Sequence, residues 1–249
     1  MSGHSKWANI KHKKGRQDAI RGKIFTRLAK EVTIAAREGG GNPDMNARLR
    51  LAVQNARAQN MPNDNIQRAI KKGTGEIAGG MIEEYTYEGY APGGIAVIVE
   101  TATDNKNRTF PEIKALFSKY GGNIGETNSV AWNFNRKGVI TLPTNGKTED
   151  EMMELVLECG AEDLEYDEET TRIICAMDQY GSVNKYFNDN KIEIESSRLE
   201  YIPQNMVKIT DLESAKKFMR FNDMFEEHED VQNIFTNAEI DDSIADLLD

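Results

Sequence analysis

The sequence predicts an α+β protein of several domains: an N-terminal three-helix bundle followed by two α/β sandwich domains of ferredoxin-like type, one inserted into the other. In residues 1–72, apolar side chains recur at helical spacing between short breaks, whereas alternating segments and capped helices follow from residue 81. The charge changes at the same place. Residues 1–72 hold 16 Lys and Arg and 5 Asp and Glu, net +11, and the remaining residues hold 15 and 36, net −21.

The first expected helix covers residues 19–38. Its apolar face carries Ile20, Ile24, Leu28, Val32 and Ala35. On the opposite face, cationic side chains recur every seven residues, with a further one beside them: Arg16, Lys23, Lys30 and Arg37, and then Arg27. Seven residues are nearly two helical turns, so these cations form a stripe.

Two shorter helices complete the expected bundle. "GGGNP" ends the first helix, and Asn42 is expected to cap the second, with Pro43 at its first position and Met45 on its apolar face. "QNMPND" separates it from a third helix over about 63–72, which ends in two lysines and Gly73. Short connections favour a compact bundle.

The glycine-rich stretch 73–80 marks a boundary, after which strands are expected at 83–90 and 93–103. Three helices are expected to begin at capping boxes, Thr109/Glu112, Thr148/Glu151 and Thr210/Glu213, and a fourth at Asp178. The further expected strands cover 130–135, 138–143, 164–167, 171–177, 192–202 and 231–237. The tail 238–249 is expected to be a short helix or disordered.

The order of these elements predicts the domain arrangement. Residues 138–202 follow the pattern β-α-β-β-α-β, and the elements before and after it complete a second α/β unit. We therefore expect a basic arm with a helical bundle over 1–77, a discontinuous α/β domain over 82–136 and 204–249, and an inserted ferredoxin-like domain over 137–203.

Several function classes lack the residues they need. No apolar run is long enough to cross a membrane, and the N-terminus lacks the apolar stretch of a secretory signal. Cys159 and Cys175 match no metal or redox spacing and are expected to be reduced core thiols of a cytoplasmic protein. The three histidines, His4, His12 and His228, have no partners for a metal site or a catalytic triad. We therefore expect that the protein is not an enzyme, and that it has no cofactor, no metal site and no membrane partner.

Two polar stretches have both a functional and a structural interpretation. The glycines of 88–94 and 120–126 match no phosphate-loop motif, which favours a hairpin and a helix exit. "TDNKNRT", 103–109, follows the strongest strand, and Asn105, Lys106 and Arg108 are candidate binding residues or parts of a capping loop.

The N-terminal arm carries the clearest functional signal. From Lys6 to Arg16 it holds five Lys and Arg and no carboxylate, with Trp7 among them. Lys and Arg neutralise phosphates, and an indole ring is a stacking surface for an exposed base. The alternative is a solvated basic face; continuity of the arm with the helical stripe favours a polyanion partner.

Four segments resemble the YebC/PmpR family: "GHSKWANIKHKKGRQDAIRGKIFTRLAKE", "NARLRLAVQNARAQNMPNDNIQRAIKKGTG", "YEGYAPGGIAVIVE" and "TDNKNRT". The resemblance covers nearly the whole chain and implies a helical N-terminal domain and two α/β domains. It also implies a cytoplasmic transcriptional regulator that binds DNA. The same family includes a mitochondrial translational activator of cytochrome c oxidase, which implies action on ribosomes.

The sequence therefore predicts a nucleic-acid-binding regulator of gene expression, and the alternative is a ribosome-associated translation factor that binds ribosomal RNA. The expected contact residues are Lys6, Trp7, Lys11, His12, Lys13, Lys14, Arg16, Lys23, Arg27, Lys30 and Arg37. Two competing classes remain: an enzyme with a deep cleft between the α/β domains, and an adaptor that binds proteins through an exposed apolar patch.

Overall fold

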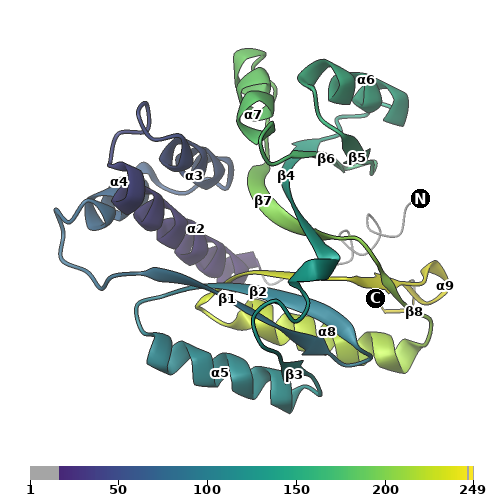
Figure 1. Cartoon of the computed structure of the whole chain (residues 1–249). Coiled ribbons are helices and arrows are strands. Elements are labelled where there is room, and N and C mark those ends of the chain that lie inside the picture. The colour runs from purple at the N-terminus through teal and green to yellow at the C-terminus, as the bar shows by residue number, and fades with distance from the viewer. Residues whose placement is uncertain (1–16, 246, 249) are drawn as a thin grey trace.

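The computed structural model describes residues 17–245 and 247–248. Its N-terminal part is helical: α2 (Gln17–Gly39), α3 (Ala47–Ala58) and α4 (Asn63–Gly73). Val32 and Ala35 of α2 are buried against side chains of the other two helices, among them Leu49 and Ile66. The apolar periodicity thus predicted this helical core, and Figure 1 shows α3 and α4 gathered at one end of α2.

The predicted start of the second helix is wrong. Asn46, not Asn42, caps α3, and its side-chain oxygen accepts the Leu49 N–H at 3.0 Å. Its Nδ2 also donates to the carbonyl oxygen of Ala35 at 2.7 Å, so one amide ties α3 to the end of α2. Asn42 accepts the Asp44 N–H in a local turn instead, and Met45 is 85% exposed.

The first sheet has the order β3-β1-β2-β9. Its strands are β1 (Glu83–Ala91), β2 (Ile95–Thr103), β3 (Asn123–Ile124) and β9 (Val231–Thr236). The helices α5 (Lys106–Lys119) and α8 (Leu212–Glu227) cover one face, where Val97 and Val99 meet Phe117, Phe221 and Phe225. Figure 1 shows these two helices together below the sheet, with α2 on the other side.

The opposite face of this sheet is covered by other parts of the chain. Ala96 and Ile98 pack with Val130 and Phe134, which lie in the connection to the second sheet. Further along β2, Ala102 packs with Ile34 of α2. The turn between β1 and β2 contains Gly93 and Gly94 in the left-handed region, as the hairpin interpretation requires.

The second sheet has the order β5-β6-β4-β7, and all its neighbouring strands are antiparallel. In chain order, this part of the protein contains β4 (Phe134–Pro143), α6 (Glu149–Cys159), β5 (Asp163–Glu165), β6 (Thr170–Ala176), α7 (Tyr180–Asp189) and β7 (Ser196–Pro203). This confirms the predicted β-α-β-β-α-β order and the α+β fold class. Cys159 and Cys175 are buried and form no disulfide bond, as expected of core thiols.

Paired strands join the two sheets. β4 and β7 pair from Phe134 with Pro203 to Thr141 with Ser196, across the expected insertion point. At the start of β4, Phe134 belongs to the apolar cluster on the face of the first sheet opposite α5 and α8. The expected limits of the three domains remain predictions.

Several expected element limits are wrong, because another residue caps the helix or continues the strand. Asn105 caps α5 in place of Thr109, Asp211 caps α8 in place of Thr210, and α7 begins at Tyr180, two residues after Asp178. The strand expected at 130–135 is a 3-10 turn, η1 (Ala131–Asn133), followed by the start of β4. The capping box of Thr148 and Glu151 is confirmed.

The sequence patterns missed the shortest elements. β8 (Val207–Ile209) and β10 (Ala238–Ile240) form a small parallel sheet, and α9 (Asp242–Ala245) follows. The tail thus contributes a strand before its short helix. Strands of two or three residues show little alternation, although β5, with three residues, overlaps the strand expected at 164–167.

Candidate nucleic-acid interface

Most of the predicted contact residues lie in the arm. Lys6, Trp7, Lys11, His12, Lys13, Lys14 and Arg16 fall outside the described residues. The helical stripe on α2 can be followed from Lys23, whose side chain is exposed.

The other stripe residues point into the molecule. Arg27 donates a hydrogen bond to the carbonyl oxygen of Glu226, and Arg37 donates to that of Ile82. Lys30 Nζ donates to the carbonyl oxygens of Ala102 and Glu229, both at 2.9 Å. These cations therefore attach α2 to the first α/β unit, and their nucleic-acid role remains a prediction.

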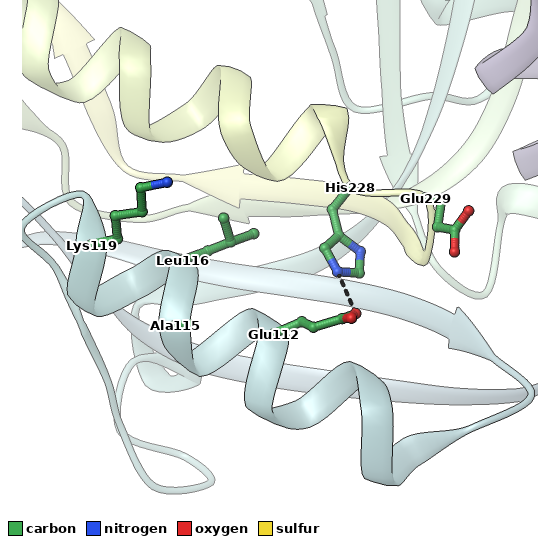
Figure 2. Close-up of a pocket in the computed structure, with 6 residues that line it drawn as sticks. All are labelled: Glu112, Ala115, Leu116, Lys119, His228 and Glu229. Atoms are coloured by element: carbon green, nitrogen blue, oxygen red, sulfur yellow. Dashed lines mark hydrogen bonds and ion pairs between the residues drawn. The ribbon is translucent and has the colours of Figure 1, made fainter.

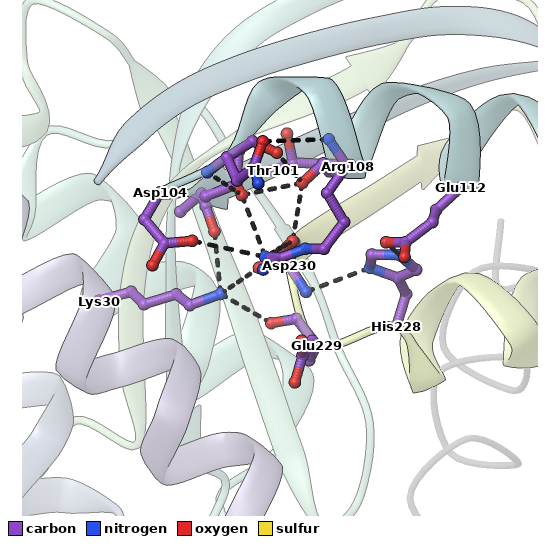
Figure 3. A network of polar contacts seen from close by, with 12 residues as sticks. Lys30, Thr101, Asp104, Arg108, Glu112, His228, Glu229 and Asp230 are labelled. Atoms are coloured by element: carbon purple, nitrogen blue, oxygen red, sulfur yellow. Dashed lines mark hydrogen bonds and ion pairs between the residues drawn. The ribbon is translucent and has the colours of Figure 1, made fainter. Parts of the chain in front are cut away.

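Asp230 is the centre of this attachment (Figure 3). Its carboxylate is buried and accepts from Lys30 Nζ at 2.8 Å, Arg108 Nη2 at 2.7 Å and Thr109 Oγ1 at 2.8 Å. The backbone of Asp230 also joins the sheet, because its carbonyl accepts the Ala102 N–H at 2.8 Å. One carboxylate thus connects α2, α5 and the start of β9.

The hydrogen bonds determine the charge state of Asp230. Burial alone would raise the pKa of this carboxyl, but the bonds from Lys30, Arg108 and Thr109 outweigh burial and lower the pKa well below its ordinary value. Asp230 is therefore a carboxylate at neutral pH.

The loop residues singled out in "TDNKNRT" also have structural roles. Asn105 accepts the Arg108 N–H at the start of α5, and Lys106 Nζ lies 4.5 Å from the centre of the Tyr85 ring. Arg108 binds Asp230. These contacts favour the capping-loop interpretation.

A shallow groove lies beside the Asp230 network (Figure 2). It has a volume of about 430 Å³ and is lined by Glu112, Ala115, Leu116, Lys119, His228 and Glu229. His228 Nδ1 accepts the Asp230 N–H, so neutral His228 carries its proton on Nε2, 3.1 Å from Glu112 Oε2. The groove is open and lies within the first α/β unit. It therefore differs from the deep cleft between the α/β domains that the enzyme hypothesis predicts. Among the described residues, no group of His, Cys, Asp or Glu could hold a metal ion.

The helical unit presents other cations outward. Lys23, Arg57, Arg68 and Lys71 are exposed. Arg68 and Lys71 lie on the polar side of α4, opposite the buried Ile66 and Ile70. The apolar period of α4 places Arg68 and Lys71 on its exposed side, so the sequence does contain a signal for them. The expected contact residues come only from the arm and the seven-residue stripe on α2.

A second attachment holds the helical unit to the second sheet. Asn55 of α3 donates from Nδ2 to the Ser197 carbonyl at 2.7 Å and accepts the Ser197 N–H at 2.9 Å. Asn55 thus pairs with the outer edge of β7 as a neighbouring strand would. The helical unit is fixed to both sheets.

The fold and the basic helical unit are those of a known family. The family model described as "TACO1/YebC protein N-terminal domain" matches residues 5–76, and the model described as "TACO1/YebC second and third domain" matches residues 82–238. The chain belongs to the TACO1/YebC family, as the sequence resemblance predicted. None of the described helices is long and apolar enough to span a membrane.

Relatives match along their whole length. A "Probable transcriptional regulatory protein" from Maridesulfovibrio salexigens is 50% identical over 98% of both chains. Another of that name from Syntrophomonas wolfei is 51% identical over 100% of both. The crystal structure of a conserved hypothetical protein from Aquifex aeolicus superposes with a TM-score of 0.88 at 44% identity, covering 95% of this chain and 97% of that one.

Proposed function

We propose that this protein is a cytoplasmic, non-enzymatic regulator of gene expression that binds nucleic acid through its N-terminal arm and helical unit. The charge separation carries the proposal, since residues 1–72 have a net charge of +11 and the rest of the chain −21. A polyanion is attracted to the first part and repelled by the second, which restricts its position on the protein. The relatives named as probable transcriptional regulatory proteins support a role in regulation.

The proposed contacts fall into two groups. In the arm, Lys6, Lys11, Lys13, Lys14 and Arg16 bind phosphates, with His12 beside them and Trp7 stacked on a base. On the helical unit, the exposed Lys23, Arg57, Arg68 and Lys71 extend this surface. The proposal does not depend on Arg27, Lys30 and Arg37, whose side chains bind within the molecule.

Salt dependence tests the proposal. The logarithm of the association constant for a nucleic acid should fall linearly with the logarithm of salt concentration, with a slope of about −4 to −7. Deletion of residues 2–16 removes five arm cations and should make the slope shallower by about 4. An unchanged slope would remove the arm from the binding surface, and absence of binding by the full chain would refute the proposal.

A second candidate function is translation control through ribosomal RNA. The arm favours it, because it combines five cations with one tryptophan and has only Ile10 as a further large apolar residue. Such a segment suits phosphates and unpaired bases of folded RNA. Cross-linking in cells, with sequencing of both DNA and RNA, separates the two targets: promoter DNA alone supports transcription control, and ribosomal RNA alone supports translation control.

A further inference from the structure

Trp132 is a large aromatic residue on the surface of the α/β part of the chain. Its side chain is 68% exposed, and it lies in η1, where the chain leaves the first sheet. Its Nε1 donates to the carbonyl oxygen of Ser129 at 3.0 Å. The only N–H of the indole is therefore used inside the protein, and the exposed ring offers its faces.

The backbone before Trp132 is held by a buried carboxylate. Glu88 is 7% exposed and accepts the N–H groups of Asn128 at 2.7 Å, Val130 at 2.9 Å and Ala131 at 2.8 Å. Hydrogen bonds to a charged acceptor are among the stronger ones in proteins. Val130 also belongs to the buried apolar cluster of Ala96, Ile98 and Phe134. The segment is therefore held both by the Glu88 carboxylate and by apolar packing.

A pair of amides holds the backbone after Trp132. Asn133 Nδ2 donates to the Asn205 carbonyl at 3.0 Å, and Asn133 Oδ1 accepts the Asn205 N–H at 3.0 Å. The Gln204 N–H donates to the Asn133 carbonyl at 2.7 Å. Since both flanks are fixed, little conformational entropy remains to be lost when a partner covers the ring.

The surroundings of the ring are neutral and rich in amides. Asn128, Asn135, Gln204 and Asn205 have exposed side chains, and Gln204 Nε2 donates to the Trp132 carbonyl at 3.3 Å and to Asn135 Oδ1 at 3.2 Å. Within 121–135 Glu126 is the one charged residue, and 202–207 contains none. This composition differs from the rest of the acidic α/β part, so repulsion of a phosphate chain is locally weak.

We propose that Trp132 and the amides around it bind an unpaired base of a single-stranded nucleic acid; this inference rests on the proposed function and adds a contact outside its basic surface. A base stacks on an indole face without any donor from the ring, and Asn and Gln side chains hydrogen-bond to base edges. A peptide segment fits less well, since the indole N–H that would bind its carbonyl already binds Ser129.

The chain offers a direct optical test, because it contains two tryptophans. In the full-length Trp7→Phe variant, Trp132 is the only source of indole fluorescence. A single-stranded oligoadenylate of about ten nucleotides should quench this emission as it binds, with binding followed independently by fluorescence anisotropy of a labelled strand. Trp132→Ala in the same background should weaken binding by about 5- to 150-fold, and Trp132→Phe by much less.

The outcomes separate this inference from the proposed function. Saturable binding with unchanged Trp132 emission and an unchanged affinity of Trp132→Ala would overturn the inference and leave the proposed function standing. No binding of the oligonucleotide or of a duplex by the full chain would remove both. A photo-reactive residue at position 132 tests the protein alternative in cells: adducts that nuclease removes support the inference, and adducts that only protease removes overturn it.

Discussion

Lys30 Nζ lies 2.8 Å from Asp230 Oδ1, and this contact joins two residues that are 200 positions apart in the chain. Lys30 belongs to the stripe of cations on α2, and Asp230 to the acidic run before β9. The two parts of the sequence have opposite net charges, and a cation of one part thus meets a carboxylate of the other at a buried point in the fold.

Asp230→Asn should destabilise the protein by about 3 kcal/mol, the low end of the range for removing one partner of a buried ion pair, since Arg108 still reaches water. The amide cannot balance the charges of Lys30 and Arg108. Chemical unfolding measures the change in the free energy of unfolding. Asp189→Asn is the control: it removes the exposed partner of Lys185 and should change stability by less than about 1 kcal/mol. Equal effects of the two variants would contradict a special role of Asp230.

The Asp230 contribution should also depend on pH. Its pKa is lowered in the folded state, so its stabilising effect is complete above the ordinary Asp pKa of about 3.9 and is lost as pH falls toward the folded pKa. The difference in unfolding free energy between the native protein and Asp230→Asn should be constant from about pH 5 to 7 and shrink below about pH 4. A difference that stayed constant down to about pH 2 would contradict the lowered pKa.

Asn55→Ala should cost about 1–3 kcal/mol, because it leaves the buried N–H and C=O of Ser197 without their partner. Hydrogen exchange should report faster exchange at the Ser197 amide. The adjacent Gln54→Ala removes an exposed contact with Asn188 and should change stability by less than about 0.5 kcal/mol. Slow exchange at Ser197 in Asn55→Ala would show that another group protects this strand edge.

Replacing Arg68 and Lys71 together with Gln should make the slope of the salt dependence shallower by about 1.5, if each neutralises one phosphate. The fold should be unaffected, since both side chains are exposed. Lys185→Gln is the matched control, on α7 beside the second sheet, and should leave the slope unchanged. A slope that responds to Lys185 and not to the α4 pair would move the interface away from the helical unit.

Cys175 should be unreactive in the folded protein. Burial is the main reason that its pKa is raised to about 11, so less than about 1% is thiolate at pH 8. A thiol reagent should modify Cys175 only after the protein is unfolded, which mass spectrometry of denaturant-treated samples can follow. Rapid modification under native conditions would show that the apolar core packed on the second sheet opens readily.

The order of the elements could be predicted because strand alternation and helix periods are local. Thr148/Glu151 and Thr109/Glu112 show where local patterns reach their limit, since both have the same capping spacing. Thr148 is an N-cap, whereas Thr109 is buried and its hydroxyl donates to the Asp230 carboxylate. A residue more than 100 positions away decides the difference, and no local pattern contains that information.

The cations of α2 show the same limit at the candidate site. The seven-residue spacing predicted a common face for Lys23, Lys30 and Arg37, but it could not predict what covers that face. Lys30 contacts a carboxylate 200 positions away, and Arg37 a carbonyl 45 positions away. The strand pattern of 130–135 also gives no sign that Trp132 is exposed, because the segment around it is a 3-10 turn and not a strand.

The paired strands β4 and β7 also define where the chain could be shortened. The last pair, Thr141 with Ser196, brings the two ends of 142–195 next to each other. A tight hairpin turn could close the chain at this point, because antiparallel neighbours need as few as about two linking residues. Residues 142–195 thus occupy the place of a loop between two paired strands. Ser197, which Asn55 binds, lies outside this segment, so removing the segment would leave that attachment of the helical unit in place.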